Sequence, residues 1–225
     1  MDVNADFSQR VLLHGAQLPW VDSPIVGVQR RMLDRIGDEV ARATSIVRYA
    51  PGSQFSPHKH SGGEEFIVLE GVFSDEHGDF PAGCYVRNPP GSRHTPGSAE
   101  GCVIFVKLWQ FDAADRSAVI IDMNKIGRVR DPERVGIAVS PLFEDERETV
   151  ELRHYQPNAK STDVFPEGAE LLVVRGSLDA LGESLQPMSW LRIPCGGQLS
   201  AAAGAAGAQV WLKQRHLRNA CAPAL

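Results

Sequence analysis

The chain has 225 residues, of which 43% are hydrophobic and 23% charged, and this composition excludes a disordered, collagen-like or coiled-coil protein. Its formal net charge is -5 and neither half is basic, so no direct nucleic-acid partner is expected. The 21 glycines and 15 prolines favour many short strands and turns over long helices.

No membrane segment or leader is expected from the sequence. Acidic residues precede the first apolar pair, and no apolar stretch approaches the roughly 18 residues that span a bilayer. We therefore expect a cytoplasmic protein without a membrane partner. The four cysteines include no C-x-x-C pair and are expected to be isolated thiols: Cys84, Cys102, Cys195 and Cys221.

Runs rich in β-branched residues, bounded by glycine and proline, recur from residue 40 onward. They predict strands within 40–52, 64–71, 83–91 and 101–111. Helical periodicity is weak. The one helix predicted is a short connector at 131–135, where an Asp-Pro pair resembles a helix start.

An internal repeat at an interval of about 105 residues organises the chain. EEFIVLEGVFSD at 64–75 corresponds to AELLVVRGSLDA at 169–180, and GCVIFVK at 101–107 corresponds to GAQVWLK at 207–213. Two copies of one β domain are therefore predicted, over residues 1–114 and 115–225. The small-residue block at 201–208 aligns with a polar turn and is predicted to be a loop between two strands.

The first copy contains a candidate metal site. His58 and His60 are two residues apart, so both imidazoles project from one face of a strand. A Ser-Gly-Gly turn then leads to Glu64, and His94 follows a Pro-Pro-Gly turn. Three imidazoles and a carboxylate suit Zn, Fe, Mn, Ni or Cu. Glu65 is a rival ligand, but strand parity favours Glu64 because Glu65 faces the other side of the sheet.

The second copy lacks these ligands. Aligned through Gly71 and Gly176, the positions of His60, Glu64 and His94 are taken by Phe165, Ala169 and Leu199, and that of His58 by Asp163 or Val164. We predict a filled apolar core without a metal. His154 and His216 have no partners at metal spacing and are expected at the surface or at an interface.

The ligand spacing resembles the two signature motifs of the cupin superfamily. The first motif reads G-x5-H-x-H-x3-E-x6-G from Gly52 to Gly71, and the second reads G-x5-P-x-G-x2-H from Gly83 to His94. Ser98 stands where the second motif ends in Asn. The resemblance implies an all-β chain of two tandem cupin double-stranded β-helix (jelly-roll) barrels, of which the second is degenerate.

Over about residues 20–110 the sequence is similar to the ChrR-type cupin, which is the effector-sensing half of an anti-sigma factor that responds to singlet oxygen. The resemblance implies one divalent ion, zinc first, on His58, His60, Glu64 and His94, and a sensing or regulatory role in oxidative or singlet-oxygen stress. It implies a small-molecule or oxidant signal and a regulatory protein partner, and cupin sheets commonly form homodimers. Because no cysteine precedes residue 40, an anti-sigma zinc domain is not expected.

A second function remains open, because ChrR-type cupins also resemble small dioxygenases. Three His and one Glu close a tetrahedral zinc shell, whereas on octahedral Fe(II), Mn or Ni they leave positions for dioxygen or substrate. Such an enzyme would cleave hydroxylated aryl ketones or diketones. No catalytic residue is assigned. Pocket-lining candidates are Phe55, Phe66, Val68 and Phe105, and Cys102 is either a redox thiol near the metal or a small buried hydrophobe.

Overall fold

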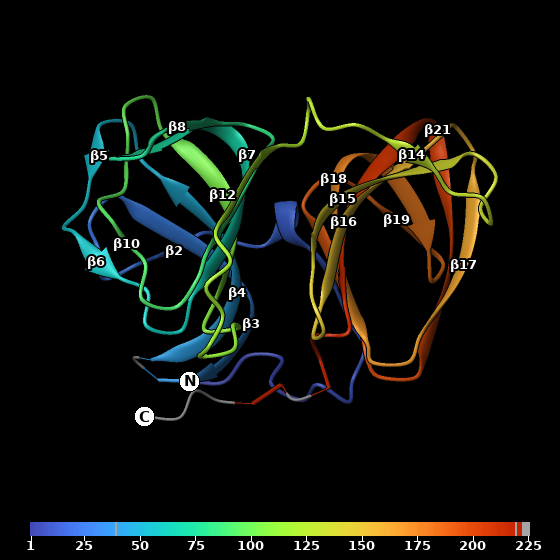
Figure 1. Cartoon of the computed structure of the whole chain (residues 1–225), viewed down its shortest axis with the longest axis horizontal. Helices are drawn as coiled ribbons and strands as arrows, with labels where there is room; N and C mark the ends of the chain where they lie inside the picture. The colour runs from blue at the N-terminus through green and yellow to red at the C-terminus, as the bar shows by residue number, and fades with distance from the viewer. Residues whose placement is uncertain (39, 219, 222–225) are drawn as a thin grey trace. The chain divides into compact units, whose positions relative to one another are not determined.

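The computed structural model describes residues 1–38, 40–218, 220 and 221, which form strands and turns with one short 3-10 helix, Gly15–Gln17. The chain divides into two compact units (Figure 1). The first unit comprises Met1–Ala5 and Pro19–Lys125 together with Cys221, and the second comprises Asp6–Leu18 and Ile126–Ala220. In the described part of the chain, no helix has the length and apolar character needed to cross a bilayer.

The first unit is an antiparallel barrel built from one large sheet and a small ribbon. The large sheet runs in the order β13-β9-β7-β12-β4-β3-β2, with β5, β8 and β11 on side branches, and the ribbon pairs β6 with β10. The strands are β2 (Val21–Asp22), β3 (Val28–Gly37), β4 (Ala41–Tyr49), β5 (Ser53–Gln54), β6 (His58–Lys59), β7 (Glu64–Asp75), β8 (Gly78–Pro81), β9 (Cys84–Asn88), β10 (Arg93–His94), β11 (Gly97–Ser98), β12 (Cys102–Leu108) and β13 (Val119–Asp122).

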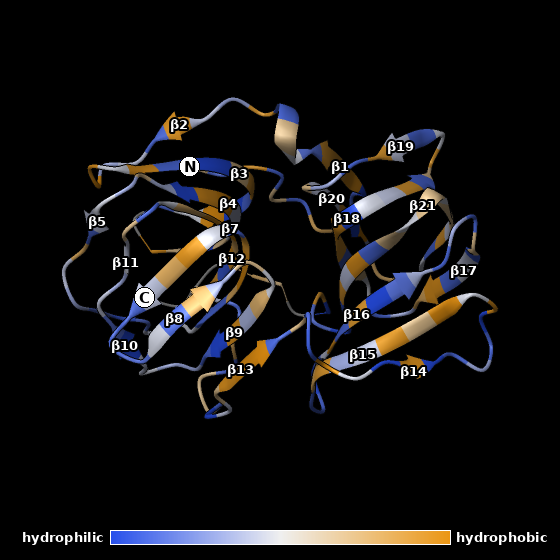
Figure 2. Cartoon of the chain, turned by 90° about the horizontal axis from the view of Figure 1, so that it is seen from above, coloured by the Kyte–Doolittle hydropathy of each residue, from blue (hydrophilic) through white to orange (hydrophobic). Residues whose placement is uncertain are grey.

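The second unit repeats this architecture with longer strands. Its sheet runs β1-β20-β18-β21-β16-β15-β14, with β17 on β21 and β19 on β18. The strands are β1 (Val11–His14), β14 (Val129–Arg130), β15 (Ile137–Glu144), β16 (Thr149–Tyr155), β17 (Lys160–Phe165), β18 (Ala169–Ala180), β19 (Glu183–Leu185), β20 (Ser189–Ile193) and β21 (Gly197–Gln214). The apolar stripes along the strands of both units are visible in Figure 2. The all-β prediction and the two jelly-roll barrels are thus confirmed.

The predicted repeat is visible in strand length and turn geometry. Strands β7 and β18 both have 12 residues and begin 105 positions apart. Gly71 and Gly176 lie at the same point of these strands, with φ of 71° and 70°. A Cβ on either would lie 2.1 Å from a carbonyl oxygen, that of Gly101 or Gly207. Only glycine is compatible with such a contact at positive φ, so both copies keep it.

The observed units differ from the predicted domains in two segments. Strand β1 from the N-terminal segment pairs with β20 of the second unit, while β13 from the connecting segment pairs with β9 of the first. The observed division therefore lies after Lys125, and residues 6–18 join the second unit, whereas the prediction was 1–114 and 115–225. Both strands extend the edge of a preformed sheet, and the repeat carries no signal for such additions.

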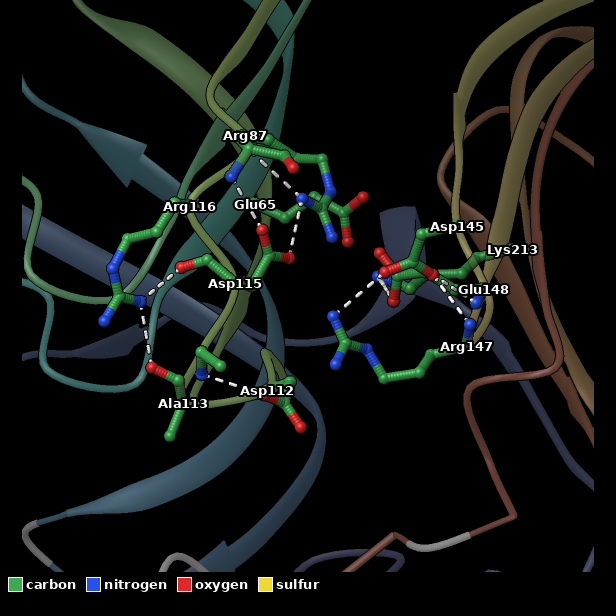
Figure 3. A network of polar contacts seen from close by, with 12 residues as sticks. Glu65, Arg87, Asp112, Ala113, Asp115, Arg116, Asp145, Arg147, Glu148 and Lys213 are labelled. Carbon is green, nitrogen blue, oxygen red and sulfur yellow. Dashed lines mark hydrogen bonds and ion pairs between the residues drawn. The ribbon is translucent and has the colours of Figure 1, made fainter.

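Each unit also buries charged residues on the sheet face opposite its apolar core. Glu65 lies opposite Lys107 and Arg87 on neighbouring strands, and Glu170 stands in the same register to Lys213 and Arg192. All six side chains are almost fully buried. Figure 3 shows part of this arrangement, including ion pairs from Arg87 to Asp115 (3.1 Å) and from Lys213 to Glu148 (2.8 Å).

The predicted helix at 131–135 is absent. Asp131 does act as an N-cap would, since its Oδ1 accepts the backbone N–H groups of Glu133 and Arg134 at 2.9 and 3.2 Å. Gly136 then takes φ of 79° and Ile137 begins β15, so the capped turn ends before a helix can propagate.

The predicted loop at 201–208 is also wrong, because these residues lie within the 18-residue strand β21. Ala201, Ala203 and Ala208 point into the apolar core of the second unit. Small side chains at these positions pack in the core without interrupting the strand. Gly207, at φ of 77°, accommodates the irregular pairing with β18.

Candidate metal centre

Three of the four histidines of the first unit, His58, His60 and His94, converge at one end of its barrel. His58 lies on β6 and His94 on β10, and the two residues are direct cross-strand partners. His60 follows β6, where its backbone is fixed by hydrogen bonds with Ser92 and Gly91, both at 2.9 Å. Two short strands and one tight turn therefore hold all three imidazoles.

The imidazole nitrogens lie close enough together to share one ion. The ring centroids are 4.7 to 5.0 Å apart, and Nε2 of His60 lies 2.9 Å from Nε2 of His94. Groups of three or more His, Cys, Asp or Glu side chains with neighbouring ligand atoms can hold a metal ion. Among the described residues there is one such group, His58, His60 and His94, whose ligand atoms all lie within 4.8 Å of one another. His60 and His94 are buried, whereas His58 is exposed. The group could hold a metal ion with one side accessible to solvent.

Glu64 is the carboxylate that faces this group. It begins β7, and its Oε2 lies 3.4 Å from Nε2 of His60 and 3.7 Å from Nε2 of His94. The amide of Asn88 on the adjacent strand β9 donates to the same oxygen at 3.1 Å. Glu65 faces the other side of the sheet, where it accepts the hydroxyl of Tyr85. Glu64 and Glu65 thus face opposite sides of the sheet, and the choice of Glu64 as the ligand stays a prediction.

Burial sets the charge state of the group. Loss of hydration lowers the pKa of His60 to about 4, with a smaller contribution from His58, and also lowers the pKa of His94. These imidazoles are therefore neutral at pH 7, the form that coordinates metals. Burial raises the pKa of the Glu64 carboxyl, because the carboxylate lacks water there. A divalent cation would offset that loss of hydration, so the donor set fits such an ion.

Sequence reasoning missed two residues that support the site. Besides Asn88, the carboxylate of Asp75 lies 3.1 Å from Nδ1 of His94. Neither belongs to the H-x-H-x3-E spacing, and each comes from a neighbouring strand or hairpin. The internal repeat carried a signal for both, because their counterparts 105 positions later are Ala180 and Ile193.

Of the pocket candidates, Phe66 and Val68 share the apolar core cluster of Cys102, whereas Phe55 is only half-buried. Cys102 is 3% exposed, and burial raises the pKa of its thiol to about 11. Phe105, the remaining candidate, is buried. The thiol therefore has the environment of a small buried hydrophobe.

In the second unit the aligned positions are filled with apolar side chains. Phe165, Ala169 and Leu199 are all members of its core cluster. Asp163, aligned near His58, is buried against Arg153 at 2.9 Å and Arg134 at 2.6 Å. In the described part of this unit, no three His, Cys, Asp or Glu side chains lie close enough together to hold a metal ion.

Two histidines of the second unit, His154 and His216, are not at the surface, which was one of the two places expected from the sequence. His154 is 7% exposed, and its Nε2 lies 3.0 Å from the hydroxyl oxygen of Ser140. The side chain of His216 is 4% exposed and lies 3.6 Å from the carboxylate of Glu170. The surface alternative was therefore wrong, because each ring is buried beside a polar partner inside the unit, and the interface alternative stays a prediction.

Comparison with known proteins supports the cupin superfamily. Residues 8–112 match the family model of the ChrR cupin-like domain. No curated protein sequence matches the chain.

Solved structures share the fold over nearly the whole chain. A crystal structure titled "putative dioxygenase" from Nostoc punctiforme PCC 73102 is 15% identical, with a TM-score of 0.77 over 97% of this chain and 88% of that one. The pirin YhhW of Escherichia coli, in complex with nickel(II), is 15% identical with a TM-score of 0.67 over 92% and 98%. A single-residue variant of the oxalate decarboxylase of Bacillus subtilis is 11% identical, with a TM-score of 0.62 over 91% and 76%. The described structure is therefore a pair of jelly-roll barrels with the cupin fold, and the ChrR-like family match falls mostly on the first of them.

Proposed function

We propose that the chain is a metal-binding cupin protein whose first barrel holds one divalent ion through His58, His60, Glu64 and His94. The observation that carries this proposal is the convergence of three imidazoles, whose ligand atoms lie within 4.8 Å of one another, with the Glu64 carboxylate 3.4 Å from His60 and 3.7 Å from His94. Zinc is the ion we expect first, since N and O donors in this number complete its shell.

The role we propose is sensing or regulation in oxidative stress. The match of residues 8–112 to the ChrR cupin-like family supports it. His58 is exposed while His60 and His94 are buried, so an oxidant or small molecule would approach the ion from the His58 side. A signal molecule bound beside His58 would move strands β6 and β10, which carry His58 and His94. These two strands pair only with each other, so few backbone hydrogen bonds oppose the movement.

The second barrel is, in this proposal, a cupin that has lost its ligands and kept its core. Phe165, Ala169 and Leu199 occupy the three aligned ligand positions, and all are buried. Its contribution is structural, which leaves one metal per chain.

A second candidate function is a metal-dependent dioxygenase acting on hydroxylated aryl ketones or diketones. The exposure of His58 favours it, because catalytic sites keep a coordination position open to substrate. When bound, redox-active iron would supply the electron transfer that dioxygen chemistry requires. The chain's own part would be to hold the substrate near His58 and to exclude water with the apolar residues below the site, Phe66 and Phe73 among them.

Metal analysis separates these two functions. Protein purified without added metal is analysed for its ion, and oxygen uptake is then measured on the Fe(II)-reconstituted form with a panel of hydroxylated aryl ketones and diketones. Zinc at one per chain without uptake supports sensing, whereas iron with substrate-dependent uptake supports the oxygenase. Absence of any stoichiometric metal, together with failure to bind added Zn(II), Fe(II), Mn(II) or Ni(II), would contradict both.

A further inference from the structure

A buried carboxylate outside the ligand set is bonded to one of the candidate ligands. Asp75 ends strand β7 at its hairpin with β8, and its side chain is only 5% exposed. Its Oδ2 lies 3.1 Å from Nδ1 of His94, while its Oδ1 accepts the backbone N–H of His77 at 2.7 Å. The turn therefore fixes the carboxylate, and the carboxylate in turn contacts the imidazole.

We propose that Asp75 is a positioning residue for the metal centre, which selects the tautomer and orientation of His94. The inference rests on the proposed metal-binding function. A carboxylate can only accept a hydrogen bond, so Nδ1 of His94 must carry the proton. Nε2 then presents its lone pair, and it lies 2.9 Å from Nε2 of His60 and 3.7 Å from the Glu64 carboxylate. The same bond raises the basicity of the coordinating nitrogen.

The hairpin also holds the segment that follows His94. Glu76 Oε2 accepts the backbone N–H of Thr95 at 2.7 Å, and Ser74 pairs with Gly97. Consecutive residues of one turn thus bond to the ligand segment. Because β10 has only two residues, these contacts limit the movement of the His94 ring.

The second barrel provides an internal control for this assignment. Its β18–β19 hairpin has the same register, since Ala180 pairs with Glu183 as Asp75 pairs with Gly78. The acid is replaced by Ala180 where the ligand His94 is replaced by Leu199. A carboxylate is therefore not needed to build the hairpin, and it occurs in the barrel where there is an imidazole to orient.

The first test is zinc affinity, measured by competition with a chromophoric chelator. Asp75→Ala, which copies the second barrel, is expected to bind Zn(II) about 10- to 100-fold more weakly, the usual effect of removing an outer-shell partner. Asp75→Asn, which retains an acceptor oxygen without the charge, should lose less. Asp79→Ala is the matched control, because Asp79 lies exposed on the same hairpin and its carboxylate accepts the Ser74 hydroxyl. Zinc affinity of Asp75→Ala within about twofold of the control would overturn the proposal.

The second readout does not require a metal. ¹⁵N chemical shifts of the histidine rings in the metal-free protein report which nitrogen carries the proton. We expect His94 to be protonated at Nδ1 in the wild type and to lose that preference in Asp75→Ala, while the thermal unfolding midpoint matches that of Asp79→Ala. An unchanged His94 tautomer in Asp75→Ala would refute the positioning role. If the wild type binds none of Zn(II), Fe(II), Mn(II) and Ni(II), the proposed function fails, and the tautomer measurement still decides whether Asp75 orients His94.

Discussion

The two barrels share a strand scaffold and differ in how they build the end where the candidate ligands of the first barrel lie. In the second barrel this end consists of the six-residue β17 paired along its whole length with the 18-residue β21. In the first barrel the corresponding segments are broken into β5, β6, β10 and β11, which have two residues each. A continuous pair of strands directs every second side chain into the barrel interior. Short strands separated by turns can instead bring several polar side chains to one point.

The difference has an energetic consequence. Each apolar side chain buried in the second barrel contributes roughly 1.5–3 kcal/mol to its stability. The first barrel instead buries imidazoles and a carboxylate, whose altered pKa values record the loss of hydration. Such a site lowers stability until an ion binds, so with the metal binding proposed here, binding and folding of the first barrel would be coupled.

The largest expected effect is the loss of metal from His60→Ala. This change removes a buried donor nitrogen that lies 2.9 Å from Nε2 of His94. We expect stoichiometric zinc to disappear, with an affinity loss beyond the ~100-fold that an outer-shell change produces. Equilibrium dialysis followed by elemental analysis measures it. A His60→Ala protein that retains one zinc per chain would remove His60 from the ligand set.

The same aligned position in the second barrel should give the opposite result. Phe165 is 3% exposed within the core, so Phe165→Ala is expected to lower the free energy of unfolding by about 3–5 kcal/mol. Zinc binding should not change. Urea unfolding followed by tryptophan fluorescence is suitable, since Trp190 and Trp211 are fully buried in this unit. If Phe165→Ala lost much of its zinc with little loss of stability, the second barrel would take part in metal binding, and the assignment of the metal to the first barrel alone would be wrong.

Much of this comparison was predictable from sequence, because it depends on short-range spacing. The period-2 alternation placed His58 and His60 together, and parity separated Glu64 from Glu65. The 105-residue repeat predicted both barrels and the apolar replacements Phe165 and Leu199. These features follow from local geometry, and the structure agrees with them.

The features that sequence reasoning missed depend on long-range pairing. Strand β1 pairs with β20, which lies far along the chain. Residues 6–18 therefore belong to the second unit, whereas the prediction assigned them to the first. Asp75 contacts His94 from the β7–β8 hairpin, 19 residues earlier in the chain, and it belongs to neither of the two ligand motifs. The alanine-rich block 201–208 has weak strand propensity, yet pairing with β17 and β18 makes it part of β21.

A smaller effect is expected in the pH dependence of the second barrel. Burial lowers the pKa of His154 to about 4, from an ordinary value of 6.5. Above pH 6.5 the ring is neutral in both folded and unfolded states and contributes no pH dependence. Below it the unfolded state takes up a proton that the folded state does not. Stability therefore falls as the pH drops toward the folded-state pKa and then levels off, by on the order of 1–3 kcal/mol in total.

The matched variant for this prediction is His154→Gln, whose amide can still donate to the Ser140 hydroxyl that His154 contacts at 3.0 Å. Urea midpoints at about pH 7 and about pH 4.5, on either side of the ordinary histidine pKa, should differ less in this variant than in the wild type. The buried tryptophans again report unfolding. An equal pH dependence in both proteins would mean that another group causes the acid sensitivity.

The smallest effect concerns the thiols, which differ between core and surface. Cys84 and Cys102 are buried in the first barrel, while Cys195 and Cys221 are exposed. Burial raises the pKa of both core thiols, that of Cys102 to about 11, so little thiolate is present at neutral pH. Titration of native protein with a thiol reagent should therefore show two fast and two slow groups. In Cys102→Ser the fast phase and the zinc affinity should stay unchanged. Rapid oxidation of Cys102 in the native wild type would instead make this thiol a candidate for the proposed oxidant sensing.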